Sequence, residues 1–407
     1  MKIRSITFFL DPEWPLNSAA IKQAGQAASL AVQNFESSGY EVQTTRLATI
    51  PFPILFSGLE AEAQITAIQA LEQTALQAGF SYTAIGPALI NLPESYHLIP
   101  EIIANTETVF CSAEIATRKD GLAVSAAQAC ARIISQLAPQ DPNGFANLYF
   151  TALANVPAGS PFFPAAYHQG GSARFALAIE SASLAVTAFQ SAETLETGLV
   201  KLRETIESHA SALTTISENL TQKTGIPFSG IDFSLAHFPD TASSLGTAIE
   251  AMGIPHIGQH GSPAAAAILA ATLDQADLPR AGFSGLLFAQ LEDTSLAQRA
   301  AEGFLTVKDL LMYSAVCGTG LDTIPLPGNT PPEHLTPLLL DLAALALRLD
   351  KPLTARLMPI PGKIAGDETK FDFPFFANSH VMPLSAENLH SPFTANQRIA
   401  IPPRPKK

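Results

Sequence analysis

Short apolar runs alternate with longer amphipathic stretches along most of the chain. Ten runs have the apolar or alternating pattern of β-strands, at residues 3–10, 41–47, 80–85, 106–112, 148–154, 174–180, 228–235, 284–291, 320–326 and 353–360. Most of the intervening stretches have apolar residues at helical spacing, at residues 17–37, 58–78, 93–104, 125–137, 194–221, 244–252, 295–301, 306–312 and 332–349 and after Ser262. Strands that alternate with helices are typical of a parallel sheet covered by helices. The pattern therefore predicts an α/β fold with the helices outside.

A break near residue 157 divides the predicted strands into two sets of five. It is followed by GSPFFPAAYHQGG, in which Pro161 and Pro164 interrupt regular structure. Eight strands would suggest a (β/α)₈ barrel, whereas ten strands with this break suggest two five-strand halves. We expect one large domain, with a first half over residues 1–156, a second half over 157–366 and an extended tail over 367–407.

Composition narrows the class of protein. Of the 407 residues, 47% are hydrophobic and only 14% are charged, well below the usual quarter. This predicts a large core and apolar helix faces that a homo-oligomer would bury. The net charge of −13 argues against a nucleic-acid partner. Three cysteines, no signal-peptide pattern and no apolar span of bilayer length predict a cytoplasmic protein with no membrane partner.

Charged residues inside β-prone runs are the candidates for chemistry. The run SAVCGTGLDTIPLPG places Asp322 in an apolar strand, where a charge costs free energy unless it is paired or used. Alternation places Asp322 on one face with Gly320 and Ile324. In residues 174–180, Arg174 and Glu180 frame two alanines on one face, which suits a barrel lumen or a cleft; the alternative is a surface edge strand.

Further candidates lie in the second half of the chain, and each has a predicted role. Asp232, Asp322, Glu180 and His168 are candidate acid–base groups. The candidate substrate-binding residues are Arg174 and Arg356 for an anionic group, Gly170 and Gly171 for close backbone approach, Ser234 beside Asp232, and Ser262 at a helix N-terminus. A structural ion-pair network is the alternative for the charged residues. No spacing motif supports a metal site, so none is predicted, and the cofactor is left open.

The motifs PFFPAAYHQGG, RFALAIES, GIDFSLA, SAVCGTGLDTIPLPG, MPIPGKIAGDE and HVMPL together resemble a prokaryotic family, number 711 in the domain-of-unknown-function series. The resemblance runs over nearly the whole chain. It implies a ten-stranded α/β barrel like that of the glycyl radical enzymes, pyruvate formate-lyase and anaerobic ribonucleotide reductase. In that fold two five-strand parallel half-sheets run antiparallel to each other, and a finger loop passes through the barrel. The resemblance carries over fold and position but no catalytic residues.

Glycyl radical chemistry is not expected here. Those enzymes carry an Arg-Val-x-Gly motif near the C-terminus, whereas the last glycine of this chain is Gly366, within PGKIAGDE. By resemblance Cys317 would lie in the finger loop. It is a candidate reactive thiolate, and the alternative is a small buried hydrophobe, which is what a free cysteine usually is.

Two functions stay open on the sequence. The first is an enzyme, a lyase or hydrolase, that uses acid–base chemistry on a small polar metabolite in the barrel lumen. The second is a small-molecule-binding or regulatory protein on a non-catalytic barrel scaffold. An open lumen with Asp232, Asp322 and His168 close together would favour the first. A lumen filled by Phe and Leu, or carboxylates paired with Arg174 and Arg356, would favour the second. A purely structural protein is a third possibility.

Overall fold

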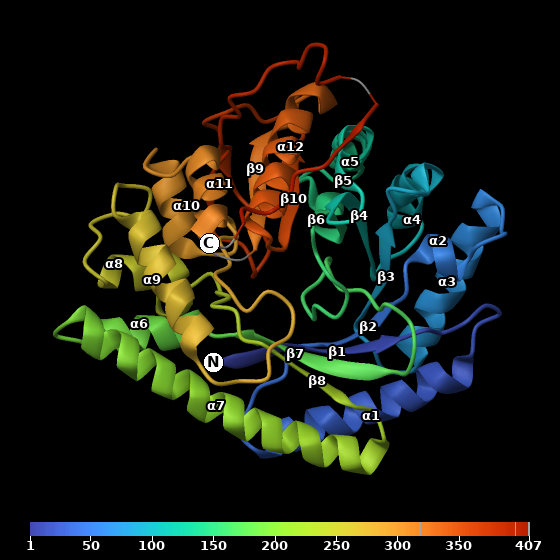
Figure 1. Cartoon of the computed structure of the whole chain (residues 1–407), viewed down its shortest axis with the longest axis horizontal. Helices are drawn as coiled ribbons and strands as arrows, with labels where there is room; N and C mark the ends of the chain where they lie inside the picture. Colours follow the sequence, from blue (N-terminus) through green and yellow to red (C-terminus); the bar gives the residue numbers. More distant parts are fainter. Residues whose placement is uncertain (317–318, 395, 406–407) are drawn as a thin grey trace.

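The chain folds around one large, mostly parallel sheet with helices packed outside it (Figure 1). The computed structural model describes residues 1–316, 319–394 and 396–405. Neighbouring strands follow the order β8 (Phe228–Asp232), β7 (Arg174–Glu180), β1 (Lys2–Leu10), β2 (Thr45–Thr49), β3 (Tyr82–Ala88), β4 (Val109–Thr117), β6 (Phe150–Ala154), β10 (Leu353–Ile360) and β9 (Gly320–Pro327). These correspond to nine of the ten predicted strands, so the α/β class is confirmed. Short β5 (Gly121–Ala123) pairs with β4 and with β13 (Arg398–Ile399).

Strand direction separates the two halves of the chain. From β1 through β2, β3, β4 and β6, each strand is parallel to its neighbour. Then β7 runs antiparallel to β1, and β10 runs antiparallel to β6. The outer pairs, β7 with β8 and β10 with β9, are again parallel. The parallel first half-sheet and the reversal at both of its edges follow the arrangement implied by the resemblance.

The predicted strand over residues 284–291 is not a ladder strand. Arg280, Leu286 and Ala289 make only isolated parallel bridges, to Ile231, Leu235 and Asp322 respectively. The reason is local, because Gly282 and Ser284 have φ values of 60° and 42°, which extended backbone does not adopt. In the part of the chain that the structure describes, the sheet is therefore not closed by continuous strand pairing.

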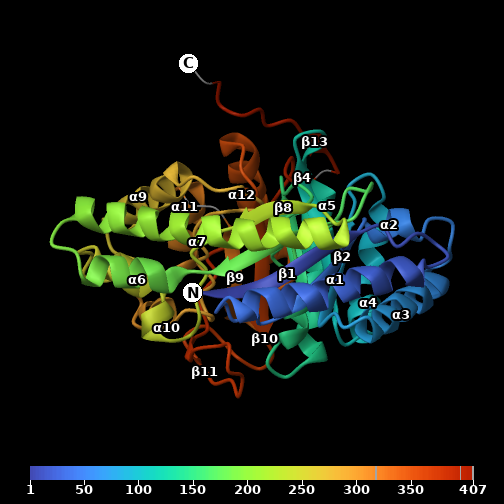
Figure 2. The same ribbon diagram turned by 90° about the horizontal axis from the view of Figure 1, so that it is seen from below.

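The predicted helices are present with small shifts of their ends. They are α1 (Ser18–Ser37), α3 (Ala61–Gln77), α4 (Ile99–Ala104), α5 (Val124–Leu137), α7 (Leu195–Thr224), α8 (Leu245–Ala251), α9 (Ser262–Gln275), α10 (Thr294–Ala301), α11 (Val307–Val316) and α12 (Pro332–Leu349). Not predicted were α2 (Phe52–Leu55), α6 (Ala182–Gln190) and the 3₁₀ segments Ala138–Gln140, Phe145–Tyr149 and Thr241–Ser243, while Pro93–Leu98 is a 3₁₀ lead into α4. Figure 2 shows α1 and α7, which are in contact, side by side along the sheet.

The two faces of the sheet pack against different partners. The outer face carries large residues such as Phe8, Leu47 and Phe175, which join the helices in the main hydrophobic core. The inner face carries smaller residues and packs against the segment PFFPAA, which we call the inner loop (residues 161–166). Phe163 packs there against a ring of mostly small side chains from four strands, which are Phe9, Ala48, Ala84 and Ala176. Phe162 packs against Ala178 of β7 and Leu287.

Hydrogen bonds hold the inner loop in place. The carbonyl of Pro161 accepts from Ser5 Oγ at 3.2 Å and from Thr7 Oγ1 at 2.8 Å, both on β1. The alanines of β7 that were predicted to face a lumen therefore face this loop, so the connection between the two halves packs against the inner face of the sheet.

The tail is extended and returns to the body of the protein. Strands β11 (Glu368–Thr369) and β12 (Ser379–His380) form a short hairpin. Its phenylalanines pack near the end of β10, where Phe376 joins Met358 and Leu291. The backbone N–H of Ala377 donates to the Leu291 carbonyl at 2.7 Å.

Candidate functional site

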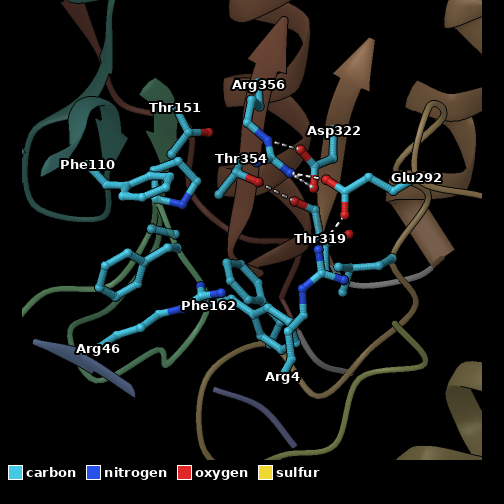
Figure 3. Close-up of a pocket in the computed structure, with 15 residues that line it drawn as sticks. Arg4, Arg46, Phe110, Thr151, Phe162, Glu292, Thr319, Asp322, Thr354 and Arg356 are labelled. Carbon is cyan, nitrogen blue, oxygen red and sulfur yellow. Dashed lines mark hydrogen bonds and ion pairs between the residues drawn. The ribbon is translucent and has the colours of Figure 1, made fainter. Parts of the chain in front are cut away.

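A cavity of about 100 Å³ lies between the sheet and the inner loop (Figure 3). Its charged lining consists of three arginines and two carboxylates, which are Arg4, Arg46, Arg356, Glu292 and Asp322. The rest is threonine hydroxyls and apolar side chains, chiefly Thr151, Thr319, Thr354, Phe110, Phe162, Phe163, Phe283 and Leu287. The charged residues come from β1, β2, β9 and β10 and from the chain just before α10.

Four of the five charged residues form one chain of ion pairs. Arg356 binds Asp322 through two hydrogen bonds, Nε to Oδ1 at 2.5 Å and Nη2 to Oδ2 at 3.0 Å. Arg356 Nη2 also donates to Glu292 Oε1 at 2.7 Å, and Arg4 Nη2 donates to Glu292 Oε2 at 2.5 Å. Burial would raise the pKa of Glu292, but Arg4 and Arg356 outweigh it and lower that pKa to about 2. Glu292 is therefore ionised at neutral pH.

Irregular strand pairing aims these side chains into the cavity. The register of β1 against β7 shifts between Ile3 and Ser5, so Arg4 lies at a β-bulge. A second bulge is in β9, where Leu321 pairs with Ala355 and Ile324 pairs with Leu357. Two residues of β9, Asp322 and Thr323, therefore stand opposite Arg356 alone. Bulges re-aim side chains in this way and are frequent beside functional sites.

The β9 bulge corrects one expectation. We predicted that Asp322 shares a face with Gly320 and Ile324, but the extra residue moves Ile324 to the face of Leu321, in the core under the helices. The bulge is also strained, because Thr323 is fully buried with φ at 45°, a region that β-branched residues rarely adopt. Its Oγ1 has no hydrogen-bond partner among the described residues.

Arg46 differs from the other two arginines. Its Nε donates to Thr44 Oγ1 at 2.9 Å, and its guanidinium lies 5.0 Å from the ring centroid of Phe163 and 5.8 Å from that of Tyr82. No carboxylate among the described residues pairs with it, and the ion pairs lie on the other side of the cavity (Figure 3). Burial, with a smaller contribution from Arg4, lowers the pKa of Arg46 to about 9, so it remains charged at neutral pH.

The lining therefore holds three guanidiniums against two carboxylates. Glu180 also acts on Arg4 through space. However, Glu180 is outside the lining, and its Oε2 accepts a hydrogen bond from Gln43 Nε2 at 3.0 Å. Among the described residues that line the cavity, one positive charge therefore has no counterpart.

Of the candidates from the sequence, the structure brings Asp322 and Arg356 together in this cavity. Arg4, Arg46 and Glu292 were missed. A signal for the two arginines existed, because each stands in a β-prone run, as Asp322 does. Glu292 directly follows the expected strand over 284–291, so in the sequence it indicates only where that strand ends. That two arginines share Glu292 depends on the pairing of distant strands.

Asp232 is a separate, fully buried group. Its Oδ1 accepts from Ser234 Oγ at 2.6 Å and from Ser284 N at 2.8 Å, and its Oδ2 accepts from Phe283 N at 2.6 Å. Burial raises the pKa of Asp232 to about 6, and these hydrogen bonds oppose the rise. Ser234 Oγ in turn accepts from Gly285 N at 3.1 Å. Asp232 and Ser234 thus hold the turn that carries Phe283 to the cavity, and neither lines it.

The other candidates lie away from the cavity lining. His168 is buried near Phe9, its backbone N–H donates to the Thr49 carbonyl at 2.9 Å, and burial lowers the pKa of its imidazole. Gly170 and Gly171 turn the chain with φ values of 95° and 84°. Arg174 pairs with Phe9 at the start of β7. Cys317 lies outside the residues that the structure describes.

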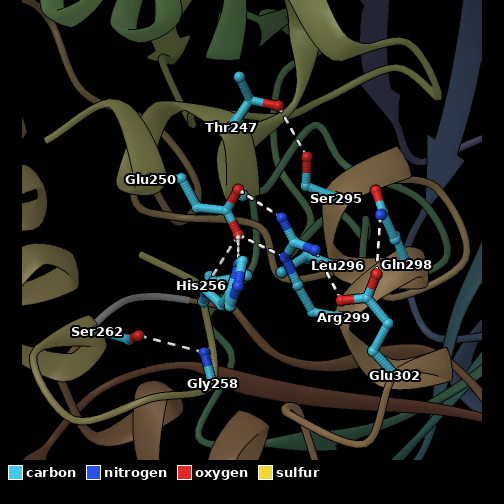
Figure 4. A network of polar contacts seen from close by, with 12 residues as sticks. Thr247, Glu250, His256, Gly258, Ser262, Ser295, Leu296, Gln298, Arg299 and Glu302 are labelled. Carbon is cyan, nitrogen blue, oxygen red and sulfur yellow. Dashed lines mark hydrogen bonds and ion pairs between the residues drawn. The ribbon is translucent and has the colours of Figure 1, made fainter. Parts of the chain in front are cut away.

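Ser262 belongs to a different polar region, shown in Figure 4. Its Oγ accepts from Gly258 N at 3.2 Å, so it closes the turn before α9. Nearby, Arg299 binds both oxygens of Glu250, with Nε to Oε1 at 2.7 Å and Nη2 to Oε2 at 3.0 Å, and it also binds Glu302. This network ties α8 to α10.

Two features are absent from the residues that the structure describes. In residues 1–316, 319–394 and 396–405, no three His, Cys, Asp or Glu side chains are grouped in a way that could hold a metal ion. Over the same ranges, none of the helices combines the length and the apolarity needed to span a membrane.

Comparison with known proteins gives the family. Residues 1–379 match the family model described as "Uncharacterised ACR (DUF711)". The chain belongs to the DUF711 family. The match confirms the resemblance drawn from the sequence motifs. The matched residues of this DUF711 protein include strands β1 to β10 and the inner loop.

Curated relatives of this DUF711 chain carry the name UPF0210 protein. One from Pyrobaculum arsenaticum is 30% identical over 344 residues, which cover 81% of this chain and 76% of the relative. One from Oenococcus oeni is 28% identical over 366 residues, covering 86% and 81%. One from Desulforamulus reducens is 26% identical over 396 residues, covering 93% and 87%. These names state no activity, so the function has to be argued from the cavity.

Proposed function

We propose that this protein binds a small anion in the cavity beneath the inner loop. The observation that carries the proposal is Arg46, a partly buried guanidinium that stays charged at neutral pH and has no carboxylate partner among the described residues. A partly desolvated charge without a counter-ion costs free energy, even where a hydroxyl and aromatic rings contact it. A bound anion would remove that cost, so the binding free energy includes its relief.

The size of the cavity limits the ligand. Its volume of about 100 Å³ is smaller than the roughly 150 Å³ cavity known to hold benzene, so a ligand has about six non-hydrogen atoms or fewer. Drug-sized ligands and nucleotides need several times that space. The proposal therefore concerns a small metabolite or an inorganic ion.

The charged groups favour a binding protein over the acid–base enzyme that the sequence suggested. Asp322 is paired with Arg356, and Glu292, with a pKa of about 2, is a poor general base, because an efficient one has a pKa near the working pH. Phenyl rings of the inner loop also line the cavity. An acid–base lyase or hydrolase is the second candidate. The strained Thr323 beside Asp322 favours it, since backbone strain concentrates at active sites.

The architecture proposed with this function is a ten-stranded barrel like that of the glycyl radical enzymes, folded as a single domain. The isolated bridges of Arg280, Leu286 and Ala289 support it, since they link β8 and its extension to β9, the two edges of the sheet. We also propose a cytoplasmic homo-oligomer. The exposed apolar side chains Phe304, Met312 and Val316, in and before α11, support the oligomer. Light scattering on the purified protein tests it, and a monomeric mass would refute it.

Thermal unfolding with and without small anions tests the binding function. The panel is phosphate, sulfate, formate, acetate, propionate and butyrate, at matched ionic strength against chloride. A ligand at ten times its Kd stabilises the folded state by about 1.4 kcal/mol. We expect stabilisation of the wild type that is lost in Arg46→Gln. Arg174→Gln is the matched control, because it removes another partly buried arginine that does not line the cavity, and it should keep the effect. No stabilising anion, or an unchanged effect in Arg46→Gln, would refute the proposal.

A further inference from the structure

We infer that the anion is a short-chain monocarboxylate, with its carboxylate on Arg46 and its apolar end against the phenyl rings of the cavity. The inference rests on the anion-binding function proposed above and adds the chemical class of the ligand. It depends on three properties of the lining: its charge, its free hydrogen-bond donors and its apolar surface.

The charge of the lining fits a monoanion. Three guanidiniums face two carboxylates, and both carboxylates are already bound to arginines. One negative charge neutralises the remainder. A dianion such as phosphate or sulfate would bring a second negative charge next to Glu292 and Asp322 with no cation left in the lining to pair with it.

The free donors fit a flat carboxylate better than a tetrahedral oxyanion. Arg46 Nε already donates a hydrogen bond to Thr44 Oγ1, and the described residues offer no acceptor to Nη1 and Nη2 of Arg46. Two N–H groups side by side match the two oxygens of a carboxylate. Two of the three threonine hydroxyls of the lining are in use, since Thr319 Oγ1 donates to the Leu286 carbonyl at 2.9 Å and Thr354 Oγ1 donates to the Thr319 carbonyl at 2.8 Å. The third, Thr151 Oγ1, has only a long contact of 3.5 Å to the Ala152 carbonyl, so at most one hydroxyl proton is left for further oxyanion oxygens.

The remaining lining is apolar. Phe162, Phe283 and Leu287 face the cavity and pack with one another or with small residues of the inner face. An inorganic ion would place charged oxygens against these apolar side chains, whereas an alkyl chain would pack against the same side chains and be removed from water. Each buried methylene is expected to tighten binding about fourfold. The affinity should then rise from formate towards butyrate and fall for longer acids, because a cavity smaller than the roughly 150 Å³ one that holds benzene accepts at most about six non-hydrogen atoms, the number in butyrate.

Titration calorimetry on the wild-type protein tests this. The ligands are the straight-chain acids from formate to hexanoate, inorganic phosphate, sulfate and neutral butyramide. We expect binding that tightens about fourfold per methylene up to butyrate, weak or no binding of phosphate and sulfate, and none of butyramide. Leu287→Ala should move the optimum to a longer acid. If this variant does not fold, the wild-type series still decides.

The outcomes separate this inference from the function on which it rests. Phosphate or sulfate binding that needs Arg46, with no dependence on acid length, would overturn the monocarboxylate and leave anion binding intact. Binding of butyramide as tight as that of butyrate would overturn the role of the charge. If no anion binds, or if the acids bind Arg46→Gln as tightly as the wild type, both proposals fail.

Discussion

Replacing Glu292 by Gln tests whether the bridging carboxylate stabilises the fold. The substitution removes one charge and keeps the shape, and it leaves Arg4 and Arg356 facing each other with side chains only 19% and 12% exposed. The pKa of Glu292 falls from 4.5 to about 2, which corresponds to about 3 kcal/mol of stability at neutral pH. That agrees with the roughly 3–5 kcal/mol measured when one partner of a buried ion pair is removed.

The sign of the pH dependence makes the test sharper. Because the pKa of Glu292 is lower in the folded state, its contribution is complete above about pH 4.5 and is lost as the pH falls toward 2. Urea unfolding at pH 7 should therefore show Glu292→Gln less stable by about 3 kcal/mol. The difference from the wild type should shrink as the pH is lowered below 4.5.

A matched control is Glu41→Gln. Glu41 pairs with Lys2 at the start of β1, but its side chain is 59% exposed, so water solvates the charges that remain and little stability should be lost. The reasoning is refuted if Glu292→Gln is within about 1 kcal/mol of the wild type at pH 7. It is also refuted if the difference between the two proteins does not narrow in acid.

Two further substitutions test the turn that Asp232 holds. Because burial raises the pKa of Asp232 from 3.8 to about 6, the folded state loses about 3 kcal/mol as the pH rises through that window. Asp232→Asn should lack this fall when urea unfolding is followed from pH 4 to 7, and an unchanged slope would contradict the assignment. A Cβ on Gly282 would lie 2.1 Å from Asp232 Oδ2, so Gly282→Ala should cost at least about 2 kcal/mol more than Gly170→Ala. Gly170 also has a positive φ but nothing within 4 Å, so equal losses in thermal melts would contradict the contact.

The sequence predicts most of the helices and strands, because the spacing of apolar residues and the positions of glycine and proline act on local structure. Residues 174–180 were predicted as a strand and are β7 to the residue. The pattern fails at 284–291, where apolar residues follow one another but the backbone at Ser284 turns out of the extended region to meet Asp232. It also missed α6, whose Val, Thr and Phe residues are as typical of a strand as of a helix.

The cavity was predicted only in part, for a different physical reason. Asp322 and Arg356 stand out because each is a charge in an apolar run on a predicted strand. Glu292, which binds Arg356, and Arg4, which binds Glu292, reach the cavity through a β-bulge and the pairing of distant strands, and strict alternation cannot reveal these. Asp232 has the same sequence signal as Asp322, yet its oxygens are taken by backbone N–H groups of a loop that only the folded chain brings near.

The inner loop makes the two halves of the chain inseparable. The segment that joins the two halves also packs against the inner face of the sheet, where Phe162 and Phe163 contact strands of both halves. Fragment complementation would succeed only if one fragment carries residues 157–173 whole, and a circular permutant opened within them would lose its interior. Exchange of either half between relatives must therefore bring a compatible connector, so the linker and the two half-sheets are expected to change together in evolution.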